Sequence, residues 1–179
     1  KKSVEKVGKL IEDKNPNLEN KEEVARKVGI GAVVYNDLSN NKIKDIVFNW
    51  DRMLSFEGET GPYVQYTHAR ACSVLRKTDL EIDSNVDFSL LTNDEAVNVV
   101  RLLQQFPDIV VTAMEKNEPS FITRHITEVA KAFNRFYHEC PIIIEEKDLQ
   151  AARLLLVSST KNVIKVGLEL LGIEAPKKM

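Results

Sequence analysis

The chain has 179 residues, 43% of them hydrophobic and 29% charged, which predicts a globular protein of one domain or a small domain with an appended piece. Its formal net charge of −2 excludes a strong overall attraction to nucleic acid, so any RNA-binding role has to rest on a local cationic patch. The sequence contains no run of about 18 apolar residues that would predict a membrane span.

Residues 1–60 are expected to form a short, mostly helical piece. Apolar residues at helical spacing predict a helix over 1–14 and a second helix that follows Asn20 as its N-cap and reaches Leu38. Two glycines in the second helix, Gly29 and Gly31, predict close backbone packing there. Residues 43–50 change to an alternating pattern, which predicts one short extended segment before the turn residues Gly58–Gly61.

Residues 61–179 are expected to form an all-α antiparallel bundle, because helical patterns follow one another with short links. A helix opened by Pro62 is predicted over 62–77, followed by an acidic linker. Thr92 and Glu95 have capping-box spacing for the next helix, and Pro107 suits the first position of another. Further helices are predicted from Pro119 to the Cys140-Pro141 stop and over about 146–171, where Gly172 ends the helix.

The helix after Pro62 carries the main candidate site. At 100° per residue, one face within about 80° holds two rings, a hydroxyl and two cations: Tyr63, Tyr66, Arg70, Ser73 and Lys77. Rings stack on unpaired bases and cations meet phosphates, so this face suits unstacked RNA. The same pattern also fits tyrosines half-buried between helices and cations on a solvated surface. The sequence pattern alone leaves both interpretations open.

Other reactive residues predict no catalytic or metal site. The histidines His68, His125 and His138 share no ligand spacing with each other or with cysteines. Cys72 and Cys140 lack a CxxC pattern, which indicates free thiols in a reducing compartment and hence a cytoplasmic protein. No glycine-rich phosphate-binding motif and no GxSxG motif occurs, so the sequence itself predicts no ATP site and no catalytic residues.

Charge is unevenly distributed along the chain. Residues 79–95 carry acidic side chains and no basic ones: Asp79, Glu81, Asp83, Asp87, Asp94 and Glu95. From Gln150 onward, basic side chains outnumber acidic ones: Arg153, Lys161, Lys165, Lys177 and Lys178 against Glu169 and Glu174. The near-neutral total therefore conceals a basic C-terminal third, whose short tail is either disordered or able to dock onto a groove.

Four sequence blocks resemble the arginyl-tRNA synthetases, which are class I aminoacyl-tRNA synthetases. In chain order the blocks are KVGIGAVVYNDLS, FNWDRMLSFEGETGPYVQYTHAR, FNRFYHECPI and GLELLGIEAPKKM. The likeness extends over essentially the whole chain, and the FEGETGPYVQY part distinguishes this family from other class I synthetases with a related helical domain. The chain starts at Lys1, in what reads as the middle of a helix, so we expect a fragment from the C-terminal part of such a protein.

The resemblance implies the activity of the whole enzyme and the share that this chain has in it. The family uses ATP, with Mg²⁺, to attach arginine to its tRNA, and its HIGH and KMSK signatures are absent here. The resemblance therefore implies the end of the catalytic half over 1–60 and a helical anticodon-binding domain over 61–179, with no cofactor and no activity alone. Its implied partners are an arginine-accepting tRNA and the upstream catalytic domain, without DNA or membrane.

The resemblance also assigns roles to particular residues. Tyr63, Tyr66 and Arg70 match positions that face the anticodon loop in the family, and Tyr137 and Met179 match positions that approach it. Charge alone adds candidate contacts to the RNA backbone: Lys77, Arg124, Arg135 and Lys165. The alternative from a different functional class is a helical protein-interaction module whose apolar groove recruits a partner helix.

Overall fold

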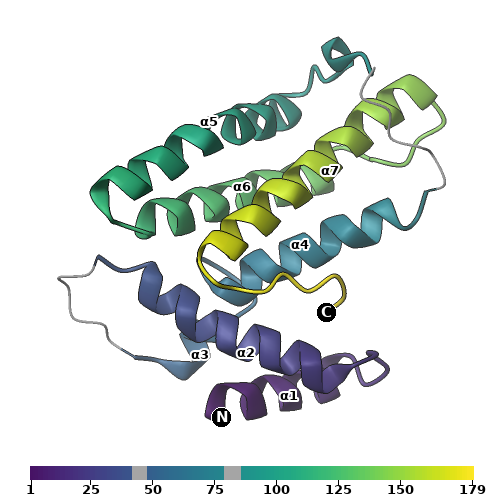
Figure 1. Cartoon of the computed structure of the whole chain (residues 1–179). Helices are drawn as coiled ribbons and strands as arrows, with labels where there is room; N and C mark the ends of the chain where they lie inside the picture. Colours follow the sequence, from purple (N-terminus) through teal and green to yellow (C-terminus); the bar gives the residue numbers. More distant parts are fainter. Residues whose placement is uncertain (42–47, 79–85) are drawn as a thin grey trace.

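The computed structural model describes residues 1–41, 48–78 and 86–179, and all regular elements in these ranges are helical. The elements are α1 (Lys2–Lys14), α2 (Lys21–Leu38), α3 (Trp50–Met53), α4 (Gly61–Leu75), the 3-10 helix η1 (Phe88–Leu90), α5 (Asp94–Lys116), α6 (Ser120–Glu139) and α7 (Lys147–Leu170). Helices α4 to α7 pack together as a bundle, while α1 to α3 lie beside the N-terminal end of α4 (Figure 1). The all-α prediction is confirmed.

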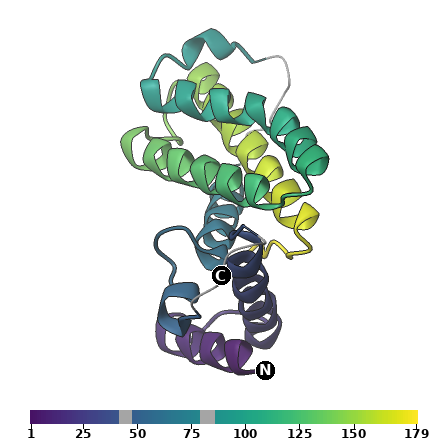
Figure 2. The ribbon, with the colours of Figure 1, turned by 90° about the vertical axis from the view of Figure 1, so that its left-hand side faces the viewer.

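The molecule is elongated, with the bundle at one end and α1 to α3 at the other (Figure 2). In the smaller part, α1 packs along α2, and the apolar residues between them include Val7, Ile11 and Val28. In the bundle, Ile126, Phe133 and other buried side chains of α6 pack against α4, α5 and α7. Helix α4 belongs to both parts, since it contacts α2 as well as α6 and α7.

Glycines allow the closest backbone approaches, as the sequence predicts for Gly29 and Gly31. A Cβ atom at Gly29 would lie 2.8 Å from the backbone of Val4, where α1 crosses α2. A Cβ atom at Gly61 would lie 2.8 Å from Tyr35 Cβ and 2.9 Å from the carbonyl oxygen of Gly31. The start of α4 is therefore pressed onto α2 at a distance that only glycine permits.

Local rules gave wrong predictions at three places. Pro107 does not begin a helix but lies inside α5, where the missing N–H and the ring clash are offset by packing of the helix on α6. The residue before α5 is Asn93 rather than Thr92, so the predicted capping box is not formed at Thr92. Trp50 begins the short helix α3 instead of ending an extended segment.

Asn20 does precede α2, but it takes a left-handed conformation at φ 54° and its side chain makes no capping hydrogen bond. The rest of the extended segment, over 42–47, and the part of the acidic linker over 79–85 lie outside the described residues. In the ranges that the structure describes, no helix is both long enough and apolar enough to cross a membrane.

Two glycine substitutions test the helix contact between α1 and α2. Gly29→Ala should lower the free energy of unfolding by about 1–3 kcal/mol, because the new methyl group collides with the backbone of α1. Gly8→Ala is the matched control on α1: its Cβ atom would meet only Ala25 Cβ, at 3.9 Å, so helix propensity should raise stability by about 0.5–1 kcal/mol. Urea unfolding of both variants measures the difference, and equal effects would contradict the close contact.

Candidate nucleic-acid interface

The candidate interface begins with the cap of α4. Thr60 Oγ1 accepts a hydrogen bond from the backbone N–H of Tyr63 at 3.1 Å, and its own hydroxyl donates to the Ser55 carbonyl at 2.6 Å. Pro62 lies in the first turn, where it has no intrahelical partner to lose. This cap fixes where α4 begins, and burial of the face with Val64, His68 and Ala71 leaves Tyr66 on the outward face.

Arg70 lies between two tyrosine rings. Its Cζ atom is 4.8 Å from the centre of the Tyr66 ring and 5.4 Å from that of Tyr137, so a cation–π contact forms with each. Arg70 Nη1 also donates a hydrogen bond to Asn134 Oδ1. The guanidinium is held in one orientation, and its other N–H groups make none of the hydrogen bonds assigned among the described residues.

Asn134 on α6 connects Arg70 to Tyr63. Its Nδ2 atom donates at 3.0 Å to the Tyr63 hydroxyl and at 3.0 Å to Thr67 Oγ1. The Tyr63 ring is half-buried against the bundle core, whereas Tyr66 keeps 38% of its surface exposed. Of the two tyrosines on this face, Tyr66 therefore offers a ring to a ligand, and Tyr63 supports the residues around it.

Arg70 and Tyr66 line a pocket of about 360 Å³ between α4, α6 and the C-terminal tail. The lining residues are Asn15, Leu18, Tyr66, Ala69, Arg70, Ser73, Val74, Arg76, Lys77, Tyr137, Lys178 and Met179. Among their side chains are four cations and no carboxylate. We call this the cationic pocket; it carries local positive charge on a chain whose net charge is −2.

An apolar groove of about 610 Å³ adjoins the cationic pocket and shares Asn15, Tyr66 and Met179 with it. Its walls come mainly from α1 and α2, with Leu10 and Val28 among them, and from Phe56. The Phe56 ring meets the Tyr66 ring edge-on, with 6.1 Å between the ring centres. Tyr66 and Met179 thus form a boundary between a charged and an apolar depression.

Five of the nine predicted RNA-binding residues line the cationic pocket: Tyr66, Arg70, Lys77, Tyr137 and Met179. Tyr63 reaches it only through Asn134. Arg135 and Lys165 do not line the pocket; Arg135 is ion-paired with Glu95 at 3.3 Å, and Lys165 contacts Glu169 at 3.5 Å.

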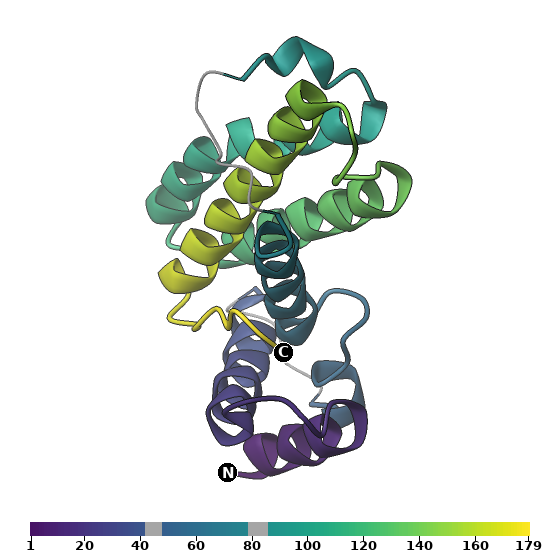
Figure 3. The same ribbon diagram turned by 90° about the vertical axis from the view of Figure 1, so that its right-hand side faces the viewer.

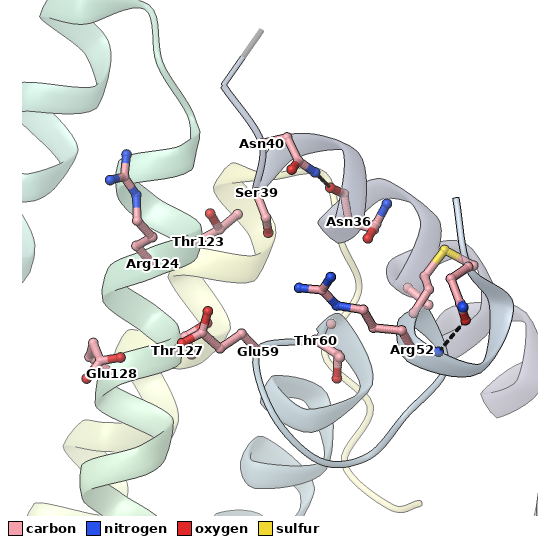
Figure 4. A pocket seen from close by; sticks show the side chains of 14 residues that line it. Asn36, Ser39, Asn40, Arg52, Glu59, Thr60, Thr123, Arg124, Thr127 and Glu128 are labelled. Atoms are coloured by element: carbon pink, nitrogen blue, oxygen red, sulfur yellow. Dashed lines mark hydrogen bonds between the residues drawn. The ribbon is translucent and has the colours of Figure 1, made fainter. Parts of the chain in front are cut away.

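Arg124 lies in a separate pocket of about 590 Å³ between α2, α3 and α6, which shares no residue with the cationic pocket. Figure 4 shows Arg52 reaching toward the middle of that pocket, while the Arg124 guanidinium points away from it. Arg124 instead donates to the Ser120 carbonyl at 3.0 Å and stacks over Phe121. Carboxylates of Glu59 and Glu128 also line this pocket, so its charge is mixed.

The sequence analysis did not name three residues as candidate RNA contacts or supports that the structure places in or beside the cationic pocket: Asn134, Arg76 and Lys178. Asn134 lies three residues before Tyr137 on one helix face, and this spacing was the available signal. Nothing in the sequence distinguishes Arg76 and Lys178 from other basic residues, and only the path of the C-terminal tail brings them close together.

The buried histidines and cysteines are held uncharged. Burial is the main cause that lowers the pKa of His68 and of His125, and for His68 the lysines Lys161, Lys165 and Lys177 add to the effect. Burial also raises the pKa of both Cys72 and Cys140, which are free thiols. Within residues 1–41, 48–78 and 86–179, no group of His, Cys, Asp and Glu side chains is arranged to hold a metal ion.

Two family models match the chain in adjoining regions. The model of the DALR anticodon binding domain matches residues 64–179, and that of the catalytic domain of class I (R) tRNA synthetases matches residues 1–50. The cationic pocket is lined mainly by residues within the first match.

Curated relatives and solved structures agree with these matches. The chain is 59% identical over 177 residues to the arginine–tRNA ligase of Alkaliphilus metalliredigens and 48% identical to that of Clostridioides difficile, covering 99% of this chain in each case. It superposes on the arginyl-tRNA synthetase of Thermus thermophilus with a TM-score of 0.93 at 34% identity over 99% of this chain. The chain spans about a third of each protein, 31% in all three comparisons. The resemblance drawn from the four sequence blocks is confirmed.

The two buried histidines predict a pH dependence of stability. In the unfolded chain the two histidines gain protons near pH 6.5, whereas in the folded chain their pKa values are lower. The free energy of unfolding should therefore be highest above about pH 6.5 and should decrease as the pH falls below that value. Urea unfolding at about pH 7.5 and pH 5.5 measures the loss, since paired carboxylates such as Glu59 titrate lower still. A variant carrying both His68→Asn and His125→Asn should lose most of this dependence; a wild-type profile that is flat would contradict it.

Proposed function

We propose a function from one premise: the chain belongs to the family of DALR anticodon-binding domains. It binds the anticodon loop of a tRNA, and the names of its relatives indicate an arginine-accepting tRNA. The observation that carries this proposal is the cationic pocket, where an exposed ring, an ordered guanidinium and three further cations lie together without a carboxylate side chain.

The pocket chemistry suits an unstacked RNA loop. The exposed ring of Tyr66 supports a base by stacking, which contributes about 1–3 kcal/mol per base. Arg70 is oriented before RNA arrives, so its free N–H groups bind a phosphate or a base edge with little further loss of side-chain entropy. Met179 contacts a nucleotide that turns toward the apolar groove. Arg76, Lys77 and Lys178 contribute attraction to the sugar-phosphate backbone.

The activity of the whole protein is part of the proposal. We infer that it attaches arginine to tRNA with ATP, and that residues 1–60 end its catalytic half while residues 61–179 form the anticodon-binding domain. The chain carries neither HIGH nor KMSK signatures, so its residues do not fit an ATP site and no catalytic step is derived from them. Its share of the reaction is to bind and orient the far end of the tRNA.

Replacing the exposed ring tests the stacking role. Tyr66→Ala should weaken binding of an arginine tRNA about tenfold or more, because one stacking contact is lost. Tyr66→Phe is the matched control: it keeps the ring and should bind within about twofold of wild type. Filter binding measures both, alongside a tRNA changed only in its anticodon, which wild type should bind more weakly. Equal affinity for the two tRNAs would refute anticodon recognition.

Salt dependence distinguishes RNA binding from the protein-interaction alternative. Four cations that each neutralise one phosphate of a single-stranded loop predict a slope of about −3 in a plot of log K against log salt. Lys77→Gln should make this slope shallower by about 0.7–1, whereas Lys116→Gln, on α5 and outside the pocket, should leave it unchanged. A slope near zero would instead favour an apolar helix-binding surface.

A further inference from the structure

The last eight residues form an extended segment that we call the C-terminal strap (172–179). Gly172, at φ 71°, turns the chain out of α7, and the N–H groups of Gly172 and Ile173 donate to the carbonyls of Glu169 and Leu168, each at 2.9 Å. The strap then passes between α4 and α2 (Figure 3), and its contacts follow α4 from Gln65 to Arg76. It ends at Met179, on the boundary between the cationic pocket and the apolar groove.

Side chains of α4 and of the residue that follows it hold the main chain of the strap. Gln65 Nε2 donates to the Glu174 carbonyl at 2.8 Å, and His68 Nδ1 lies 2.9 Å from the Pro176 carbonyl, where it acts as the donor. Arg76 Nη1 donates to the Lys177 carbonyl at 3.2 Å. These bonds place Glu174, Pro176 and Lys177 beside Gln65, His68 and Arg76 in that order, and because the acceptors are main-chain carbonyls the bonds do not depend on the side chains of the strap.

Two of these donors are buried and therefore decide the position of the strap. Gln65 is 0% exposed and His68 is 2% exposed, so breaking either bond would leave a buried polar side chain without this partner, and loss of the His68 bond would also leave the buried Pro176 carbonyl unpaired. The ion pairs of the strap, Glu174 with Arg26 and Lys27 and Lys178 with Glu19, involve partly or fully exposed side chains and contribute little. Neither Gln65 nor His68 lines the cationic pocket or the apolar groove.

Gly31 on α2 leaves the space in which this contact forms. A Cβ atom there would lie 2.7 Å from Gln65 Nε2 and 3.0 Å from Ile173 Cγ2. Gln65 also donates to the Lys27 carbonyl of α2 at 3.2 Å, so one amide joins α2, α4 and the strap. The start of the strap is thereby fixed to both parts of the molecule.

We propose that Gln65 and His68 are positioning residues for RNA binding, which act by holding the C-terminal strap in the register that places Met179 and Lys178 at the cationic pocket. The inference rests on the proposed function, because it concerns the same pocket. The inference gives α4 two roles: its outward face contacts RNA, and its inward face positions the C-terminal strap, which forms one wall of the cationic pocket. Replacing Gln65 or His68 should therefore weaken RNA binding, although neither side chain contacts the RNA.

Methionine methyl signals provide a direct readout of the strap. The chain has three methionines, of which Met53 is 3% exposed in the smaller part and Met114 is 69% exposed on α5. In the chain labelled with ¹³C-methyl methionine, His68→Leu and Gln65→Leu should each shift the Met179 signal toward the position of a free chain end. The Met53 and Met114 signals should remain in place, as internal evidence that the fold persists.

RNA affinity is measured on the same variants with the anticodon stem-loop of an arginine tRNA. His68→Leu should bind about tenfold more weakly, and His68→Asn, whose amide can donate near the position of Nδ1, should restore most of the affinity. If His68 acts through the strap, His68→Leu and Met179→Ala should be non-additive when combined. The variant Gln65→Leu repeats the measurement should His68→Leu fail to fold.

His125 supplies a matched control. It is a second buried histidine, and its Nε2 atom lies 2.9 Å from the Leu102 carbonyl between α5 and α6, away from the strap. His125→Leu should lower stability to a similar degree yet leave the Met179 signal and RNA affinity unchanged.

An unmoved Met179 signal in both His68→Leu and Gln65→Leu, or affinity losses that add fully with Met179→Ala, would overturn the inference. A wild-type chain that does not bind the stem-loop would instead overturn the proposed function, and the Met179 signal would still decide whether these residues hold the strap.

Discussion

The close contact of α4 with α2 is the constraint on which the rest of the structure depends. Gly61 and Gly31 bring the two backbones so near that a Cβ atom at Gly61 would lie 2.9 Å from the Gly31 carbonyl. The Thr60 cap fixes the first turn of α4 at the same point. From this start, one face of α4 packs into the bundle and the other, with Tyr66 and Arg70, lines the cationic pocket. A displacement here would move the core and the pocket together.

The pocket shows how a chain of net charge −2 builds a cationic surface. Attraction to RNA depends on local potential within about 10 Å rather than on the total charge, because salt screens distant charges. Arg70 and Lys77 come from α4 and the turn that follows it, whereas Lys178 arrives from the far end of the sequence. Glu174 pairs with Arg26 outside the pocket lining, and Glu19, which does not line the pocket, pairs with Lys178 at its edge. Folding therefore concentrates positive charge that the composition conceals.

Ordering of Arg70 distinguishes this site from a set of surface cations. An exposed arginine loses much rotational freedom when it binds a phosphate, and that entropy opposes binding. Here the rings of Tyr66 and Tyr137 and the amide of Asn134 restrict the guanidinium beforehand. The loss of side-chain entropy therefore occurs on folding, when Tyr63 and Thr67 accept hydrogen bonds from Asn134 and hold it in place. Of the two tyrosines in this network, Tyr63 is half-buried and Tyr66 is exposed.

Local sequence determined the helices, the fold class and one face of α4, because these depend on residue spacing along a single element. Tyr66, Arg70 and Lys77 follow from a period of 3.6 residues, and the end of α7 follows from the conformational freedom of Gly172. The continuity of α5 through Pro107 did not follow, since packing on α6 outweighs a local penalty of about 3 kcal/mol. Tyr137 and Met179 entered by family resemblance rather than by spacing.

Tertiary structure alone decided that Asn134 meets α4 and that the strap meets α4 and Arg76. Those contacts join residues from 64 to 109 positions apart, among them Gln65 with Glu174 and Arg70 with Asn134. No local periodicity encodes such a meeting, because it depends on the angles at which whole helices cross. The sequence by itself thus supplied the ring and the cations of one helix, and the packing of that helix against a distant tail completed the pocket.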